Sequence, residues 1–339
     1  MNSLEESARS YPSSYSGESS RQLLSASTIT THHWIACDPA SVEILRTVDK
    51  VKDTPSTLLI QGESGTGKDL LAGLIHYSSH RCDEPFLKID CSSIPQELLE
   101  SELFGYEKGA FTGAYARKLG KLEFAGKGTI VLDEITALGI ETQAKLLRVI
   151  EDRNFGRLGG TELIPVDARL VVLSREPLGD LVRGGTFRED LFFRLNVIPV
   201  QLLPLRERRN DIIPLVEHFL HSFREKYGKS QLKVERRVFD ELAAYAFPGN
   251  VRELRNLVDR LVMLAEGDAI TSKQLPDGVR QQKAGPKSNN DRPTLEQLER
   301  QYIAEILEFT RGKKGKAATI LGISRKTLLE KRKRYGLVE

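Results

Sequence analysis

The chain has 339 residues, of which 40% are hydrophobic and 29% charged, with a formal net charge of +3. This length suits two or three globular domains, and so small a net charge does not by itself indicate a partner. Three cysteines do not make a disulfide framework, no run of about 18 apolar residues predicts a membrane span, and the N-terminus lacks an apolar signal-peptide core. We therefore expect a cytoplasmic protein without a membrane partner.

Residues 1–31 are rich in Ser and Thr and poor in aliphatic side chains, which predicts a disordered tail. Residues 32–205 alternate short apolar runs with amphipathic stretches. That alternation predicts an α/β subdomain, in which helices flank a parallel sheet. The expected strands cover residues 57–61, 86–90, 129–134 and 168–173.

A glycine-rich loop, GESGTGKD, follows the first strand and precedes a helix. In this context backbone N–H groups wrap phosphate oxygens, and Lys68 reaches the β- and γ-phosphates. The flanking strand and helix disfavour the alternative, a glycine-rich turn with a lone lysine. Asp69 departs from the general motif, because a Ser or Thr hydroxyl normally meets magnesium there. The predicted nucleotide-binding residues are Gly62, Glu63, Ser64, Gly65, Thr66, Gly67, Lys68 and Asp69.

The strand over residues 129–134 ends in two carboxylates, Asp133 and Glu134. This arrangement suits Mg²⁺ coordination by Asp133 and activation of a water molecule by Glu134. Paired acids also end strands without catalysis, but the phosphate-binding loop upstream favours the catalytic interpretation.

Between the loop and the acids lies a short apolar segment with glycines near both ends. Gly105, Gly109 and Gly113 argue against a regular helix or strand there. One interpretation is a buried connection, and the other is a mobile loop that presents Phe111 and Thr112 to a partner. The residues of this loop are Gly109, Ala110, Phe111, Thr112, Gly113 and Ala114.

Residues 206–280 predict a helical subdomain, with Asn250 as a candidate cap of its last long helix. Expected helices cover 212–223, 238–246 and 251–265. The polar segment 281–293 predicts a linker because it carries Gly285, Pro286 and Pro293.

Residues 294–339 predict a small helical domain, with a helix, a glycine turn and a second helix capped by Ser324. This is a helix-turn-helix pattern, and basic residues decorate its second helix. The alternative is a solvated basic helix, but turn and charge together favour DNA binding. The predicted DNA-binding residues are Ser324, Arg325, Lys326, Thr327, Lys331 and Arg332.

Several motifs occur in the order and spacing of the bacterial enhancer-binding proteins, which are AAA+ activators of sigma-54 RNA polymerase. The chain resembles this family over residues 33–275, and its C-terminal segment resembles the family's Fis-like DNA-binding domain. The resemblance implies a AAA+ P-loop α/β fold with a helical lid and a helix-turn-helix domain. It also implies ATP and Mg²⁺ as cofactors and a hexameric ring. The motifs are GESGTGKD, ESELFGYEKGAFTGA, IVLDEI, QAKLLRVIE, FREDLFFRLNV, LPLRER and FPGNVREL.

The resemblance also implies roles for individual residues. Residues 62–69 become Walker A, and Asp133 and Glu134 become Walker B. Arg188 and Arg194 resemble arginine fingers that reach the γ-phosphate of a neighbouring subunit, and Arg252 resembles a sensor II arginine. The alternative for both fingers is ion pairing with Glu189 and Asp190 on the helix surface. The Gly109–Ala114 loop would contact sigma-54.

Two positions differ from the family's pattern. Asp90 stands where the family usually has Asn, and a carboxylate cannot donate the hydrogen bond that this Asn gives the Walker B glutamate. Ser174-Arg175 stands where sensor I usually reads Thr-Asn. Both changes bear on the coupling of hydrolysis to movement more than on nucleotide binding.

The sequence thus predicts an ATP-driven activator that binds upstream enhancer DNA and remodels sigma-54 RNA polymerase from the closed to the open complex. The alternative is a DNA-binding regulator that uses ATP only to oligomerise. The N-terminal tail is too short for a receiver domain, so we expect control by expression level or by a separate regulatory protein.

Overall fold

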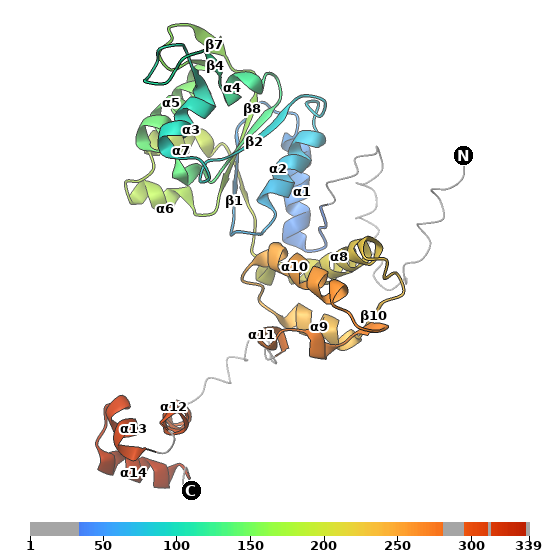
Figure 1. Ribbon diagram of the computed structural model, residues 1–339, viewed down its shortest axis with the longest axis vertical. Helices are drawn as coiled ribbons and strands as arrows, with labels where there is room; N and C mark the ends of the chain where they lie inside the picture. The colour runs from blue at the N-terminus through green and yellow to red at the C-terminus, as the bar shows by residue number, and fades with distance from the viewer. Residues whose placement is uncertain (1–33, 281–294, 311–312, 337–339) are drawn as a thin grey trace. The chain divides into compact units, whose positions relative to one another are not determined.

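The computed structural model describes residues 34–280, 295–310 and 313–336. Its contacts divide the chain into two compact units, Met1–Gln281 and Gln282–Glu339, which are described separately below (Figure 1). The predicted tail and linker lie outside the described residues. Within the described ranges, none of the helices combines the length and the apolar character needed to cross a membrane.

A five-stranded parallel sheet forms the centre of the first unit, in the order β2-β5-β8-β1-β9. Four of the strands agree with the sequence prediction to within one residue, and β9 was not predicted. The strands are β1 (Leu58–Gln61), β2 (Phe86–Asp90), β5 (Thr129–Asp133), β8 (Arg169–Ser174) and β9 (Ile198–Gln201).

Helices cover both faces of this sheet because successive strand side chains point to opposite sides. Leu58 and Ile60 pack with α1 and α2, whereas Leu59 packs in the cluster that holds α3 to α7. In Figure 1, α1 and α2 lie on one side of the sheet, and α3, α5 and α7 lie on the other. The helices are α1 (Pro39–Val51), α2 (Lys68–Tyr77), α3 (Gln96–Phe104), α4 (Lys121–Phe124), α5 (Ile140–Asp152), α6 (Leu178–Arg183) and α7 (Glu189–Leu195).

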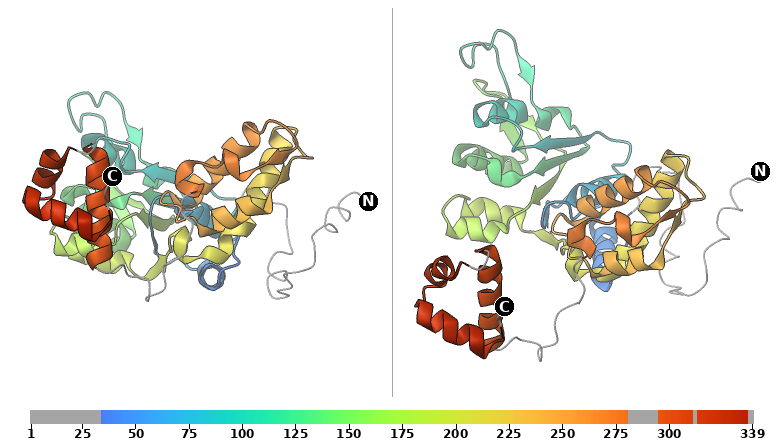
Figure 2. Two further views of the ribbon diagram at one scale, coloured as in Figure 1. Left: turned by 90° about the horizontal axis from the view of Figure 1, so that it is seen from below. Right: turned by 60° about the horizontal axis from the view of Figure 1, so that its bottom comes forward.

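Two short hairpins extend the sheet domain at the end far from the helical lid, which residues 206–280 form (Figures 1 and 2). The first pairs β3 (Gly105–Tyr106) with β4 (Lys118–Leu119), and the second pairs β6 (Asn154–Gly156) with β7 (Leu163–Pro165). The Gly109–Ala114 loop connects β3 to β4.

The lid has its own apolar core, built from α8, α9 and α10. The three predicted helices are confirmed with shifted ends, and one short parallel strand pair, β10–β11, was missed because two-residue strands show no periodicity. The elements are η4 (Leu205–Glu207), η5 (Arg209–Asp211), α8 (Ile212–Lys226), β10 (Lys233–Val234), α9 (Arg236–Ala244), α10 (Asn250–Met263), β11 (Ala269–Ile270), η6 (Ser272–Gln274) and α11 (Asp277–Arg280).

The second unit contains α12 (Leu295–Phe309), α13 (Lys314–Ile320) and α14 (Arg325–Arg334). Its small core includes Ile303, Ala317 and Leu328. Ser324 caps α14, since its side chain accepts a hydrogen bond from the backbone of Thr327 at 3.0 Å. The capping prediction is confirmed, and α13, the turn and α14 form a helix-turn-helix.

Candidate functional site

The glycine-rich loop joins the end of β1 to the start of α2. Gly65 has a φ of +78°, and a Cβ there would lie 2.4 Å from the carbonyl oxygen of Gly249, so only glycine fits this approach to the lid. The buried Lys68 ammonium donates to the backbone oxygens of Gly62 at 2.7 Å and Glu63 at 3.2 Å. The lysine side chain is thus held within the loop.

The two acids at the end of β5 have different surroundings. The Asp133 carboxylate accepts the backbone N–H of Glu134 at 3.0 Å. Glu134 has a left-handed backbone with φ 51° and ψ 55°, a conformation that costs a non-glycine residue about 1–3 kcal/mol and that clusters at functional sites. Within the described ranges no side chain donates a hydrogen bond to the Glu134 carboxylate, so its oxygens are available to a water molecule.

A lysine that the sequence did not single out bridges two acids of this site. The Lys88 Nζ lies 2.6 Å from Asp69 Oδ1 and 2.8 Å from Asp133 Oδ2. The carboxylates of α2 and β5 therefore converge on one cationic group that β2 supplies. Oxygen donors of this kind suit Mg²⁺. Asp133 and Asp69 would hold the ion, and it would neutralise phosphate charge there.

A cavity of about 660 Å³ extends from these groups to the lid. This volume lies within the range of small-molecule sites, which bury most of their ligand between apolar walls and a few polar groups. The phosphate-binding end holds residues 64–69 with Asp133 and Glu134. The cavity is also lined by Trp34, Ile35, Arg208, Leu215, His218, Phe219, Ser222, Phe223, Val251, Arg252 and Arg255.

The segment before α1 reaches this cavity because Asp211 anchors it. The Asp211 carboxylate accepts the backbone N–H groups of Cys37 and Asp38, both at 2.7 Å, and the Ser41 hydroxyl. It also pairs with Arg208, whose guanidinium lies 6.0 Å from the Trp34 ring centroid. The sequence carried no local signal for this placement, since Asp211 lies at least 170 positions away.

Trp34 is the only tryptophan of the sequence, and it lines the cavity beside Gly67. Nucleotide binding should therefore change its emission, because the ligand alters the polarity and contacts of the indole ring. A fluorescence titration with ADP or ATP should saturate, and the same titration of Lys68→Ala should not respond. A saturable response in Lys68→Ala would place the nucleotide elsewhere.

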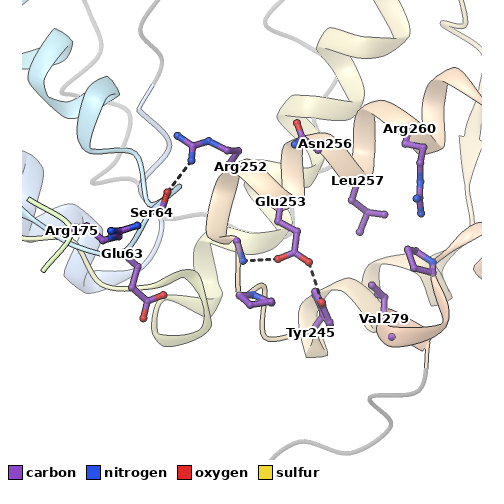
Figure 3. Close-up of a pocket in the computed structure, with 14 residues that line it drawn as sticks. Glu63, Ser64, Arg175, Tyr245, Arg252, Glu253, Asn256, Leu257, Arg260 and Val279 are labelled. Atoms are coloured by element: carbon purple, nitrogen blue, oxygen red, sulfur yellow. Dashed lines mark hydrogen bonds between the residues drawn. The ribbon is translucent and has the colours of Figure 1, made fainter. Parts of the chain in front are cut away.

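The lid touches the phosphate-binding loop through the start of α10 (Figure 3). The backbone N–H groups of Val251 and Arg252 donate to the Gly65 oxygen at 3.0 and 3.3 Å. The Arg252 guanidinium donates to the Ser64 hydroxyl at 2.9 Å. These contacts place the predicted sensor II arginine at the boundary between lid and loop.

Asn250 does not cap α10, which corrects the sequence expectation. It is the first residue of the helix, and its side chain faces the phosphate-binding loop instead. The amide nitrogen donates to Ser64 O at 3.0 Å and to Glu63 Oε2 at 3.1 Å, and the amide oxygen accepts from Leu205 N at 2.8 Å. Asn250 therefore joins lid to loop, a role that local sequence could not reveal.

Glu63 completes this junction. Its carboxylate pairs with both terminal nitrogens of Arg206, at 2.6 and 2.9 Å. The Arg206 guanidinium, with a further hydrogen bond from Asn250, lowers the pKa of the Glu63 carboxyl to about 2. The loop is thereby tied to η4 and α10 by charge as well as by backbone contacts.

The two positions that depart from the family pattern have separate surroundings. The Asp90 carboxylate accepts the Ser92 hydroxyl at 2.6 Å and the Ser92 amide at 3.0 Å, and these bonds lower its pKa. Arg175 is exposed, 3.9 Å from Glu176, and lines a second cavity of about 760 Å³ with Arg252 (Figure 3). The hydrogen bonds of the Asp90 carboxylate to Ser92 therefore stay within the turn that follows β2.

The two predicted fingers lie at the start and end of α7. Arg188 forms two hydrogen bonds with Asp190, at 2.6 and 3.0 Å, and Arg194 pairs with Glu151 of α5 at 2.9 Å. Arg194 is exposed, and Arg188 is half-buried. Surface ion pairing thus occurs within one chain, and action on a neighbouring subunit stays a prediction.

The Gly109–Ala114 loop is compact and displays its large side chain. The Gly109 N–H donates to Ala114 O at 2.9 Å and closes the loop. Phe111 is 45% exposed, with its ring 4.9 Å from that of Tyr106 in an edge-to-face contact. Thr112 is exposed, whereas Ala114 is buried. The interpretation as a buried connection therefore fails for the two residues at the tip.

Arg157 holds the base of this loop. Its guanidinium is almost fully buried and pairs with Glu107 at 2.9 Å, Glu123 at 2.7 Å and Glu162 at 3.0 Å. The hydrogen bonds that the guanidinium donates to these carboxylates, above all those to Glu123, raise the pKa of Arg157. One buried cation thus connects the loop to α4 and to the β6–β7 hairpin.

In the helix-turn-helix unit the predicted DNA-binding residues occupy two environments. Ser324, Arg325 and Lys326 are exposed at the start of α14. The Lys331 ammonium instead pairs with Glu299 of α12 at 2.5 Å. The structure gives Lys331 a role within the unit that its place in a basic run did not suggest.

Fold and site together define a AAA+ P-loop ATPase domain with a helical lid, joined to a helix-turn-helix unit. Family models agree along the chain. The Sigma-54 interaction domain matches residues 34–201, the AAA+ ATPase lid domain matches 206–292, and the bacterial regulatory protein, Fis family, matches 294–335. The chain belongs to the sigma-54-dependent AAA+ transcriptional activators, the bacterial enhancer-binding proteins.

Similar proteins cover most of the chain. Regulatory protein AtoC of Escherichia coli (strain K12) is 42% identical over 313 residues, which are 90% of this chain and 68% of AtoC. Transcriptional regulatory protein FlbD of Caulobacter vibrioides is 40% identical over 329 residues, 92% of this chain and 72% of FlbD. The structure of NtrX from Brucella abortus in complex with ATP matches with a TM-score of 0.68 and 35% identity, covering 90% of this chain and 70% of NtrX.

Proposed function

We propose that the protein activates transcription by sigma-54 RNA polymerase, and that it remodels the closed complex to the open complex by ATP hydrolysis in a hexameric ring. ATP would bind residues 62–69 with Mg²⁺, Glu134 would activate the attacking water, and Arg252 would contact the nucleotide from the lid. Upstream enhancer DNA would be bound by the helix-turn-helix unit.

The observation that supports this proposal most is the path from the site to the exposed loop. The strand β2 ends at Asp90, whose register partner is Asp133, and the chain then runs through α3 directly into β3 and the loop. A movement of β2 that follows a change at the bound phosphates would therefore reach Phe111 and Thr112 through α3 and β3. The Arg157 cluster supports the base of the loop, so movement at the base would carry the tip with it.

The deciding experiment is an in vitro open-complex assay with the full chain, sigma-54 RNA polymerase, promoter DNA and ATP. We expect open complexes only with hydrolysable ATP. ATP turnover without open complexes would support the alternative, a DNA-binding regulator that uses ATP only to oligomerise. One observation favours that alternative. The Asp90 carboxylate accepts hydrogen bonds from Ser92, and it has no side-chain N–H group that could donate to Glu134.

Action of the arginine fingers across subunits can be tested by mixing. Arg194→Ala and Lys68→Ala should each lack turnover, the first while still binding ATP. Mixed rings should recover part of the ATPase activity, because one interface then combines an intact loop with an intact finger. Lack of recovery at every mixing ratio, with mixed rings demonstrated, would contradict action in trans.

The two environments on α14 predict different effects on DNA binding. Lys326→Ala should weaken binding and lower the slope of log K against log salt by about one unit, because one phosphate contact no longer releases its counterion. Lys331→Met should mainly lower the melting temperature of the unit, since it breaks the pair with Glu299. Equal salt slopes for Lys326→Ala and the wild type would place the phosphate contact on another residue.

A further inference from the structure

The bridge between Asp69 and Asp133 lies at the place where the proposed ATPase would bind its metal ion. Three elements contribute to it: α2 provides Asp69, β5 provides Asp133 and β2 provides Lys88. The Lys88 Nζ lies 2.6 Å from one carboxylate oxygen and 2.8 Å from the other. An ammonium group at such distances satisfies both carboxylates and holds them close together.

The positive charge of Lys88 partly compensates the negative charges of Asp69 and Asp133. Asp69 adds a carboxylate where a neutral hydroxyl normally stands, so the site contains one more negative charge than the general motif. Without a cation between them, Asp69 and Asp133 would repel each other. Lys88 provides that cation from a strand whose Asp90 lies in register with Asp133. An alanine or serine at position 88 would leave the pair uncompensated.

We propose that Lys88 acts as an internal cation that occupies the metal position of the nucleotide-free protein and excludes free Mg²⁺ from it. The ammonium and a divalent ion cannot both bind the same Asp133 oxygen, because two cations at contact distance repel strongly. Mg²⁺ would therefore bind together with the nucleotide, because the phosphates would supply the additional negative charge that lets the ion compete with Lys88 for Asp133.

This proposal rests on the metal-dependent ATPase function, and it makes Lys88 a positioning residue that acts through Asp69 and Asp133. Its consequence is that metal and nucleotide bind together. A protein with a neutral residue at position 88 would bind the divalent ion before the nucleotide arrives.

The test uses Mn²⁺ as the probe and the full chain without nucleotide, with free Mn²⁺ followed by its electron paramagnetic resonance signal. Lys88→Met should bind Mn²⁺ more tightly than the wild type by about tenfold or more, since one unit charge at contact distance has been removed. Lys88→Arg keeps the charge and should bind Mn²⁺ about as weakly as the wild type does. In Lys88→Met/Asp69→Asn the gain should disappear, because the second carboxylate of the site is lost.

Lys52→Met is the matched control. Lys52 also pairs with one carboxylate, Asp49, at 2.6 Å, and its side chain is 31% exposed against 36% for Lys88. This control should leave Mn²⁺ affinity unchanged. The melting temperature gives a second measurement: Lys88→Met should melt lower than the wild type in EDTA and regain stability with Mn²⁺.

An unchanged Mn²⁺ affinity in a folded Lys88→Met protein would overturn the proposal. If Lys88→Met does not fold, Lys88→Gln undergoes the same titration with the same expectations. No step of this test needs ATP turnover or polymerase. A wild type that fails to hydrolyse ATP, combined with the Mn²⁺ shift, would therefore overturn the ATPase proposal and leave the role of Lys88 standing.

Discussion

Replacing Thr112 by Ala, or Phe111 by Ala, should abolish open-complex formation while ATP hydrolysis continues close to the wild-type rate. Neither side chain has a group that takes part in phosphate or water chemistry, and both are exposed at the tip of the loop. Their effect would come from contact with sigma-54, where a desolvated aromatic anchor carries a large share of the binding energy.

The measurement compares melting temperature, ATPase rate, nucleotide-dependent sigma-54 binding and open-complex yield on each variant. Tyr115→Ala provides a matched control, because Tyr115 is an 88% exposed aromatic residue just outside the loop. This control should keep open-complex formation if the contact is confined to residues 109–114. A Thr112→Ala protein that opens promoters normally would refute the assigned role of the loop.

The second large effect concerns Glu134. Glu134→Gln should keep ATP binding but slow hydrolysis by about 10²–10⁴-fold, the range in which a positioned general base contributes. The amide cannot accept the proton of the attacking water. The substitution should disturb the fold little, because the Glu134 carboxylate accepts no hydrogen bond within the described residues and the side chain keeps its size.

Binding can be followed by Trp34 fluorescence and hydrolysis by phosphate release on the same preparation. Asp90→Asn is the informative companion, since it restores the amide that the family usually has at this position. If Asp90 and Ser92 set the coupling, Asp90→Asn should change the open-complex yield per ATP hydrolysed while nucleotide affinity stays constant. Hydrolysis by Glu134→Gln at the wild-type rate would remove Glu134 from its catalytic role.

Much of this protein's organisation can be predicted from local sequence motifs. The turn from β1 into α2 needs glycines and a lysine at fixed spacing, and that spacing is visible along the chain. The same holds for the acids that end β5 and for the serine that caps α14. Each of these features depends on backbone geometry within a few residues, so the sequence predicted them directly.

Other features needed the fold. Asn250 and Glu63 are separated by 187 positions, and the Arg157 cluster draws carboxylates from three segments up to 50 positions away. No local periodicity reports such contacts. Sequence analysis therefore predicted Asn250 as a helix cap, which is wrong, and Lys331 only as a DNA-binding residue. It gave no role to Arg157 or Trp34.

The sequence by itself determined the class of chemistry, because phosphate binding, acid placement and the helix-turn-helix are encoded over short stretches. The tertiary structure decided which groups meet around that chemistry. The parallel order β2-β5-β8-β1-β9 sets β2 beside β5, and only then does Lys88 reach both Asp69 and Asp133. Strand order arises from the packing of apolar faces across the whole domain, so it cannot be predicted from any single segment of the chain.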